Sequence, residues 1–260
     1  MNDLAGKVAI ITGGGYGIGK VIARAFGAAK MKLVLAARSP GPLEEARREL
    51  AEAGAAVVAL PTDVAREEQC ARMVRTAVES FGRLDVLVNN AGIAGPTKPI
   101  TETTLAEWQE TLDVNITGAW LCAREAIRAM AAAGRGNILN ISSAAGRRGY
   151  PLRSPYSASK WALIGLTQTL AAEGGRHGIR VNCICPGPVE GDRIERVIRA
   201  RAASTGTPHE QVRQWFVGDS PLQRMVTEDE VARVALFLVS EASAGMTGQT
   251  LNVDGGKIMT

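Results

Sequence analysis

Short apolar segments alternate with longer amphipathic segments along the whole length of this 260-residue chain. Within the amphipathic segments, hydrophobic residues recur every three or four positions, which is the spacing of one buried helix face. Strands are expected at residues 7–12, 32–36, 55–60, 84–88, 137–141, 179–184 and 249–253. Helices are expected at residues 16–29, 43–53, 65–81, 105–133, 156–173 and 228–239, with a break near Thr117 and Gly118.

This alternation predicts an α/β protein. Strands that are apolar throughout, each followed by a helix, form a parallel sheet that is buried on both faces. About seven strands with helices on both faces make a Rossmann-like, doubly wound sheet. The length would also accommodate two small domains, but no linker, low-complexity segment or charge tract divides the pattern. A single domain over residues 1–260 is therefore expected.

The alternation is interrupted between residues 188 and 220. There the spacing lengthens, and glycine, proline, serine and threonine surround a helical piece at residues 193–203. A long excursion from a compact domain is usually a lid or a binding loop. Because of where this segment leaves the sheet, we expect a substrate lid at about residues 188–220, with a surface insertion as the alternative.

The composition, with 46% hydrophobic and 22% charged residues, is ordinary for a soluble globular protein. The net charge of +4 suits an anionic cofactor, although it follows equally from surface composition. No basic block is interleaved with aromatic residues, so no nucleic-acid partner is expected. No apolar run approaches the ~18 residues of a membrane span, and the first residues lack the pattern of a secretion signal. We therefore expect no membrane partner and a cytoplasmic location.

The cysteines and histidines are the candidate ligands of a zinc site. They are Cys70, Cys122, Cys183, Cys185, His177 and His209. Cys183 and Cys185 would share one face of a strand, but a structural zinc site needs four ligands. We expect buried, reduced thiols and no metal site.

Five glycines lie within residues 11–20, directly after the first expected strand. Gly13, Gly17 and Gly19 are spaced G-x-x-x-G-x-G. Glycine lets the backbone approach phosphate groups closely, and the following helix N-terminus offers free N–H groups and the positive end of its dipole. A pyrophosphate-binding loop is expected here, rather than a tight turn alone.

The end of the second expected strand carries Ala37, Arg38 and Ser39. A protein that binds NAD(H) usually has an acidic residue there, which holds the 2′-hydroxyl of the adenosine. A guanidinium instead forms bidentate, charge-assisted bonds to a 2′-phosphate. Because the acid is missing and Arg38 follows, NADP(H) is favoured as the cofactor, with NAD(H) possible.

Further short motifs occur in order at the expected strand ends. They are TGGGYGIG (12–19), DV (63–64), NNAG (89–92), Asn115, ISS (141–143), YSASK (156–160) and PGPV (186–189). Together they cover essentially the whole chain, which resembles the classical short-chain dehydrogenase/reductase family. The resemblance implies an NAD(P)-dependent oxidoreductase of a small alcohol or carbonyl substrate. It also implies a homotetramer, in which the helices around residues 105–133 and 156–173 pack between subunits.

Tyr156, Lys160 and Ser143 are the candidate catalytic residues. Tyr156 and Lys160 are four residues apart at a helix start, so their side chains face the same way. An adjacent ammonium lowers the pKa of a phenol from its usual value of about 10, so that it can exchange a proton with a substrate oxygen. Ser143 would hydrogen-bond that oxygen. By resemblance, Lys160 also holds the nicotinamide ribose, and Asn115 supports a water relay through an irregular helical turn.

The resemblance also implies the cofactor contacts. The pyrophosphate is lined by Gly13, Gly15, Tyr16, Gly17, Ile18 and Gly19; the adenosine by Arg38, Ser39, Asp63, Val64, Asn90, Ala91 and Gly92; and the nicotinamide side by Tyr156, Lys160, Pro186, Gly187 and Val189. Two positions depart from the family pattern. The glycine loop lacks the basic residue that many NADP-dependent relatives carry, so Arg38 stands largely alone. Gly191 replaces a threonine whose hydroxyl often contacts the cofactor.

The residues near the candidate catalytic tyrosine leave the substrate open. Arg147, Arg148 and Arg153 either receive an anionic substrate group or face the solvent. The leading hypothesis is a reductase or dehydrogenase that uses NADP(H) on a secondary alcohol or ketone, such as an oxoacyl-thioester reductase or a general carbonyl reductase. The alternatives are an NAD-dependent sugar or polyol dehydrogenase and an inactive, cofactor-binding regulatory protein.

Overall fold

The computed structural model describes residues 2–259 and contains a seven-stranded parallel sheet in the order β3-β2-β1-β4-β5-β6-β7. The strands are β1 (Val8–Thr12), β2 (Lys32–Ala37), β3 (Val57–Pro61), β4 (Val86–Asn89), β5 (Gly136–Ile141), β6 (Ile179–Pro186) and β7 (Thr250–Val253). In the central register, Ile10 of β1 lies opposite Val34 of β2 and Leu87 of β4. The predicted α/β class and doubly wound parallel sheet are confirmed.

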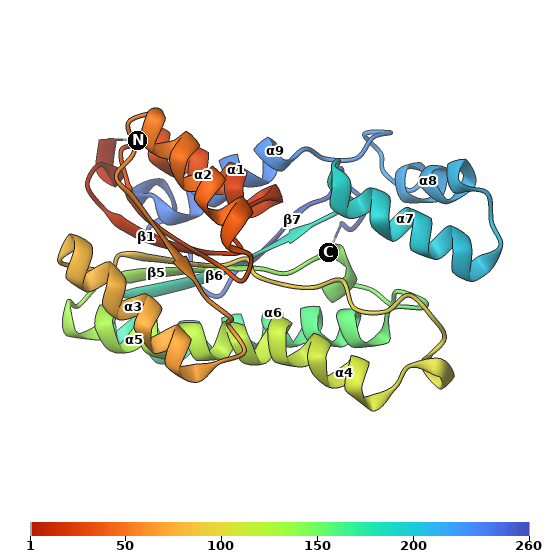
Figure 1. Cartoon of the computed structure of the whole chain (residues 1–260), viewed down its shortest axis with the longest axis horizontal. Coiled ribbons are helices and arrows are strands. Elements are labelled where there is room, and N and C mark those ends of the chain that lie inside the picture. The colour runs from red at the N-terminus through yellow and green to blue at the C-terminus, as the bar shows by residue number, and fades with distance from the viewer. Residues whose placement is uncertain (1, 260) are drawn as a thin grey trace.

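Helices cover both faces of the sheet (Figure 1). They are α1 (Gly17–Ala28), α2 (Pro40–Glu52), α3 (Glu67–Phe81), α4 (Leu105–Leu112), α5 (Gly118–Ala132), α6 (Ser154–Gly174), α7 (Asp192–Thr205), α8 (His209–Gly218) and α9 (Glu228–Val239). On one face α1 and α9 bury Phe26 and Leu238 against the sheet. On the other, α3 and α5 bury Met73 and Met130. None of the helices within residues 2–259 combines the length and apolarity needed to cross a bilayer.

The strand order reverses between β1 and β4. From β1 the chain proceeds outward to β2 and β3, and it then returns to build β4 to β7 on the other side. A doubly wound sheet binds its ligands at the carboxyl ends of the strands that flank such a reversal. The glycine loop after β1 and the segments after β4 and β5 meet at this edge.

The region expected to be one helix with a break is continuous in direction but changes its winding. A π-helical turn, Asp113–Thr117, joins α4 to α5, and Thr117 and Gly118 keep ordinary right-handed helical torsions. The α-helical winding is therefore interrupted near Thr117 and Gly118, as expected, but by a π turn rather than by an end of the helix. A π turn accommodates an extra residue without ending the helix, and this one buries Val114 and Asn115.

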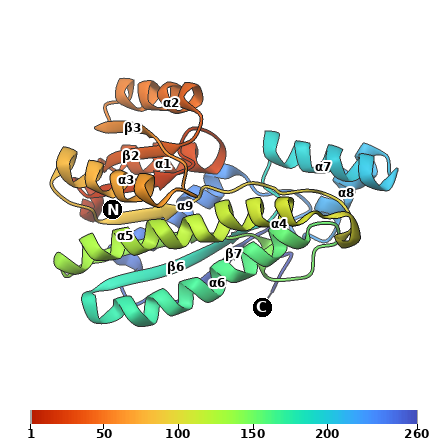
Figure 2. The ribbon, with the colours of Figure 1, turned by 60° about the horizontal axis from the view of Figure 1, so that its bottom comes forward.

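The segment after β6 forms a helical hairpin, α7 and α8, which projects from the carboxyl edge of the sheet (Figure 2). Its own small core consists of Ile198, Val212, Phe216 and Met225. No helix was expected specifically at residues 209–218, where α8 forms around Val212 and Phe216. The expected helix at residues 193–203 is confirmed and runs slightly longer at each end.

Candidate active site

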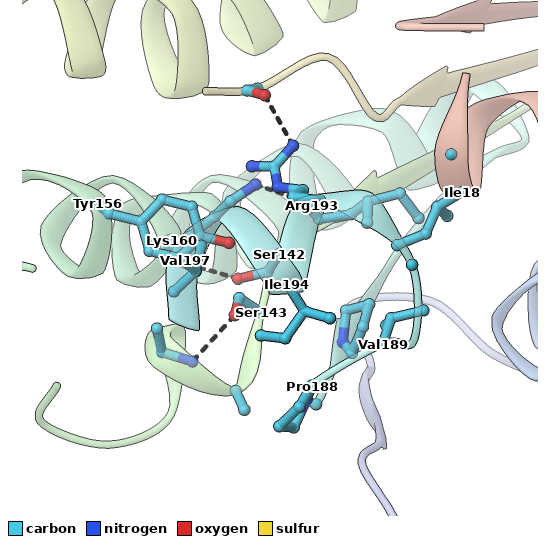
Figure 3. Close-up of a pocket in the computed structure, with 18 of the residues that line it drawn as sticks. Ile18, Ser142, Ser143, Tyr156, Lys160, Pro188, Val189, Arg193, Ile194 and Val197 are labelled. Atoms are coloured by element: carbon cyan, nitrogen blue, oxygen red, sulfur yellow. Dashed lines mark hydrogen bonds between the residues drawn. The ribbon is translucent and has the colours of Figure 1, made fainter. Parts of the chain in front are cut away.

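A cavity of about 700 Å³ opens at the carboxyl edge of the sheet (Figure 3). It is lined by the glycine loop, the segments that follow β4 and β5, the start of α6, and the segment from β6 into α7. Of the candidate catalytic and cofactor-binding residues, it contains Gly13, Tyr16, Gly17, Ile18, Asn90, Ala91, Gly92, Ser143, Tyr156, Lys160, Pro186, Gly187 and Val189. Gly15, Gly19, Arg38, Ser39, Asp63, Val64 and Asn115 lie outside its lining.

The glycine loop has the shape that a bound pyrophosphate requires. Gly13 and Gly17 have φ of 68° and 59°, in the left-handed region that favours glycine. A Cβ on Gly19 would lie 2.3 Å from the carbonyl oxygen of Gly13, so α1 packs closely on the loop. Tyr16 forms no side-chain cap, which leaves the first N–H groups of α1 without a side-chain acceptor at the cavity. These features fit the phosphates of a dinucleotide.

Thr12 and Asn90 support this loop through hydrogen bonds. The Thr12 hydroxyl accepts hydrogen bonds from the backbone N–H groups of Asn90 and Ala91, each at 3.0 Å, and donates to Val88 O. The Asn90 amide donates to Thr12 O at 2.9 Å. The loops after β1 and β4 are thus joined, and the Asn90 side chain supports the glycine loop. Sequence reasoning gave Thr12 no role of its own, although its place at a strand end was visible.

The residues expected at the adenosine lie at the ends of β2 and β3. Arg38 is exposed and forms no hydrogen bond or ion pair with any other described residue. Ser39 occupies the N-cap position of α2 without capping it through its side chain. Asp63 accepts a hydrogen bond from the N–H of Ala65 at 3.1 Å. Beside it, Val64 is buried so tightly against α5 that a Cβ on Gly118 would lie 2.7 Å from it.

The three candidate catalytic residues come from the segment after β5 and from α6, and they converge on one wall of the cavity (Figure 3). The Lys160 ammonium donates to Ile141 O at 2.8 Å and lies 5.7 Å from the centroid of the Tyr156 ring. Ser143 Oγ accepts from Ala145 N at 3.1 Å, which fixes the oxygen and leaves its own proton to donate. A further bond, from Ser142 Oγ to Lys160 O at 2.7 Å, ties α6 to the end of β5.

Two of the tyrosines that line the cavity, Tyr156 and Tyr150, have pKa values shifted in opposite directions. Burial by itself would raise the pKa of Tyr156, but the positive charges of Lys160 and Arg193 outweigh it. Hydrogen bonding with Ser143 assists them, and the pKa is lowered to about 8. Burial raises the pKa of Tyr150 far above its usual value, so this phenol stays protonated. Such divergence identifies Tyr156 as the phenol able to exchange protons near neutral pH.

Asn115 lies behind the cavity wall, fully buried in the π turn. Its amide donates to Ile93 O at 3.1 Å and to Ser159 Oγ at 3.0 Å, while its Oδ1 accepts from Ile93 N at 2.8 Å. Ser159 Oγ in turn donates to the carbonyl of Tyr156. Asn115 therefore connects the segment after β4 to the first turn of α6, with both amide hydrogens used within the protein.

The segment after β6 covers one side of the cavity opening. Val189 pairs with Val226 in an isolated bridge, and Gly191 has φ of 132°, which only glycine adopts readily. Gly191 stands where the family usually has a threonine, so the hydroxyl of that threonine is absent from the cavity. Arg193 of α7 donates to Gly92 O at 2.9 Å across the opening. Sequence reasoning missed this contact, which joins two segments about a hundred residues apart in the chain.

The sequence matches the family described as enoyl-(acyl carrier protein) reductase over residues 13–257. It is 39% identical over 256 residues to glucose 1-dehydrogenase 2 of Bacillus subtilis, covering 98% of this chain and 95% of that protein. The chain belongs to the short-chain dehydrogenase/reductase family. Its members act on alcohols and ketones with a nicotinamide cofactor, and this chain is therefore an oxidoreductase of that kind.

Solved structures of this dehydrogenase/reductase family include both cofactor types. A xylitol dehydrogenase with bound NAD⁺ is 32% identical, with a TM-score of 0.95 over 97% of this chain and 99% of that one. A variant of actinorhodin polyketide ketoreductase with NADPH is 34% identical, with a TM-score of 0.92 over 96% and 97%. Overall similarity therefore leaves the preference between NAD(H) and NADP(H) undecided.

Proposed function

We propose that this dehydrogenase/reductase transfers a hydride between NADP(H) and a secondary alcohol or ketone, as an oxoacyl-thioester reductase or general carbonyl reductase does. The observation that carries the proposal is the Tyr156 phenol, whose pKa is lowered to about 8 by the charges of Lys160 and Arg193 and by hydrogen bonding with Ser143. A bound nicotinamide supplies or accepts the hydride. The phenol donates a proton to the carbonyl oxygen in reduction and takes it from the hydroxyl in oxidation.

The neighbouring side chains have separate parts in this proposal. Ser143 donates a hydrogen bond to the substrate oxygen and stabilises the negative charge that develops there. Lys160 lowers the pKa of Tyr156, which stabilises the phenolate, and it holds the nicotinamide ribose. Asn115 positions α6 and the segment after β4. The family resemblance further implies that it supports a water relay. Residues 188–220 act as the lid, with Arg193 holding it to Gly92.

The preference for NADP(H) rests on the end of β2. Ala37 stands at the position where NAD-binding proteins usually carry a carboxylate, which would repel a 2′-phosphate. The next residue, Arg38, is exposed, and its guanidinium has no partner among the described residues. Gly13, Gly15, Tyr16, Gly17, Ile18 and Gly19 would hold the pyrophosphate; Ser39, Asp63, Val64, Asn90, Ala91 and Gly92 the adenosine; and Pro186, Gly187 and Val189 the nicotinamide side.

An NAD-dependent sugar or polyol dehydrogenase is the second candidate, because glucose and xylitol dehydrogenases are among the similar proteins. An inactive regulatory protein is disfavoured, since Ser143, Tyr156 and Lys160 are all present and face one cavity. A cytoplasmic homotetramer is proposed as well. Trp120 of α5 and Trp161 of α6 support it, since they are 44% and 49% exposed, and Trp120 lines a shallow hollow together with Ala162 and Leu166 of α6.

The test is a turnover screen with NADPH and NADH over ketones, oxoacyl thioesters and sugars, together with titration of each cofactor. Turnover of ketones with NADPH and weaker binding of NADH are expected. Equal or tighter binding of NADH would overturn the assignment of Arg38. Turnover of sugars with NAD⁺ alone would favour the second candidate.

A further inference from the structure

The cavity continues beyond Tyr156 into an end lined by cationic side chains. Arg148, Arg153 and Lys257 all line it, although they come from the loop before α6 and from the C-terminal segment. Arg147, one of the arginines singled out from the sequence, does not. The acidic residues of the lining, Glu190, Asp192 and Glu228, lie elsewhere. Two of them flank Gly191, and Glu228 Oε1 lies 3.4 Å from where a Cβ on Gly17 would be.

Lys257 and Arg148 share one loosely held carboxylate. The Lys257 side chain is only 2% exposed, and its ammonium donates to Phe216 O at 2.8 Å at the end of α8. Asp219 lies 3.9 Å from this ammonium and 3.7 Å from the Arg148 guanidinium, and its own side chain is 57% exposed. Long, solvated ion pairs are weak, so a better-placed anion can compete for both cations.

Arg153 adds a third positive charge that is buried. It is 3% exposed, one of its terminal nitrogens donates to Ala94 O at 2.8 Å, and its guanidinium lies 4.8 Å from the centroid of the Tyr156 ring. Within residues 2–259 its Nε–H has no hydrogen-bond partner and no carboxylate pairs with it. Burying a charge without an opposite one is costly, so this charge favours an anion in the adjoining space.

Aromatic side chains line the cavity beside Arg148 and Lys257. Tyr150 and Phe216 line the cavity, and Trp215 packs edge-on against both, with ring centroids 5.7 and 4.9 Å apart. Aromatic faces of this kind accept the apolar skeleton of a ligand. The cavity that holds the Tyr156 phenol and these cations therefore also offers an apolar surface.

We propose that this end of the cavity binds a carboxylate carried by the substrate, through Arg148 and Lys257, with the apolar skeleton against Tyr150 and Phe216. The substrates are then keto acids and the corresponding hydroxy acids, whose carbonyl or hydroxyl group meets Tyr156. This inference rests on the proposed function and adds the chemical class of its substrate. Arg153 contributes its charge to the same space.

The test uses methyl-ketone carboxylic acids of increasing chain length, each beside its methyl ester. We expect at least one acid to exceed its ester by about tenfold or more in kcat/KM, because a tenfold ratio corresponds to one good charge-assisted contact. Arg148→Gln should remove most of this preference, mainly through the KM of the acid. Arg199→Gln, which removes an exposed charge of α7 outside the cavity lining, is the matched control and should retain it.

A binding measurement separates the subsite from the reaction. Tyr156→Phe loaded with reduced cofactor should bind the favoured acid more tightly than its ester, and adding Arg148→Gln or Lys257→Gln should abolish the difference. If acid and ester bind equally, the carboxylate subsite is refuted. If the acid binds selectively but the wild-type protein turns over no ketone, the subsite stands and the proposed function fails.

Discussion

The Lys160 ammonium lies 5.7 Å from the centroid of the Tyr156 ring, and both side chains project from the first turns of α6 into one cavity. Lys160 is held there by Ile141 O, and α6 is tied to β5 through Ser142. The Lys160 ammonium, whose charge helps to lower the pKa of the phenol, is therefore held in place by a hydrogen bond to a backbone carbonyl. This geometry leads directly to a pH dependence.

The rate should report the titration of Tyr156. Its pKa of about 8 lies below that of a free phenol, because the charges of Lys160 and Arg193 together outweigh the effect of burial. Alcohol oxidation requires the deprotonated phenol, so kcat/KM in that direction should rise with pH and level off above about 8. Ketone reduction requires the protonated form and should fall over the same interval.

Replacing the lysine tests the cause of this shift. Lys160→Met removes the positive charge and should move the midpoint of any residual oxidation activity to higher pH. A profile of wild-type oxidation that stays flat between pH 6 and 10 would contradict the assignment, because the phenol of Tyr156 titrates within that range.

Gly19→Ala should disrupt the glycine loop. The new Cβ would lie 2.3 Å from Gly13 O and 2.4 Å from Asn90 Nδ2, so the loop must shift. Overpacking of this kind costs about 1–3 kcal/mol of stability, and cofactor affinity should fall with it. Thermal unfolding and cofactor titration measure the two effects.

Gly41→Ala is the matched control for that substitution. Gly41 lies in α2 with nothing within 4 Å of an added Cβ, so stability should be unchanged or slightly higher. If both variants bind cofactor as the wild type does, the glycine loop does not have the role proposed for it.

Arg38→Ala should weaken binding of NADPH and leave binding of NADH nearly unchanged. The loss of charge-assisted hydrogen bonds to the 2′-phosphate is worth about 1.5–3 kcal/mol, or roughly 10- to 100-fold in Kd. Arg48→Ala removes another exposed arginine, on α2, and serves as the control. An Arg38→Ala protein with unchanged affinity for NADPH would show that the 2′-phosphate lies elsewhere.

Much of the fold follows from local sequence. The apolar segments at residues 7–12 and 32–36 correspond to strands β1 and β2, because such nearly continuous hydrophobicity is typical of a parallel sheet buried on both faces. The family motifs likewise indicate which residues meet: Ser143, Tyr156 and Lys160 do line one cavity. The expected buried thiols are also observed, since all four cysteines are buried and free.

Other features depend on contacts that local pattern does not encode. The helix α8 exists because Val212 and Phe216 pack on α7, away from the main core. Lys257 reaches the cavity only because the chain after β7 returns beneath α8, where Phe216 O accepts its hydrogen bond. Likewise, Cys70 and Cys122 lie 3.6 Å apart across two helices that are distant in sequence. Each of these is a consequence of tertiary packing.

The central claim is that Tyr156 exchanges the proton while the rest of the cavity binds cofactor and substrate. It is tested most directly by measuring turnover and cofactor Kd for Tyr156→Phe, which removes only the phenolic oxygen and its proton. We predict that kcat falls at least about 100-fold, as for loss of a general acid–base group, while the Kd for the cofactor remains close to that of the wild type. A Tyr156→Phe protein that turns over its substrate at nearly the wild-type rate would contradict the claim.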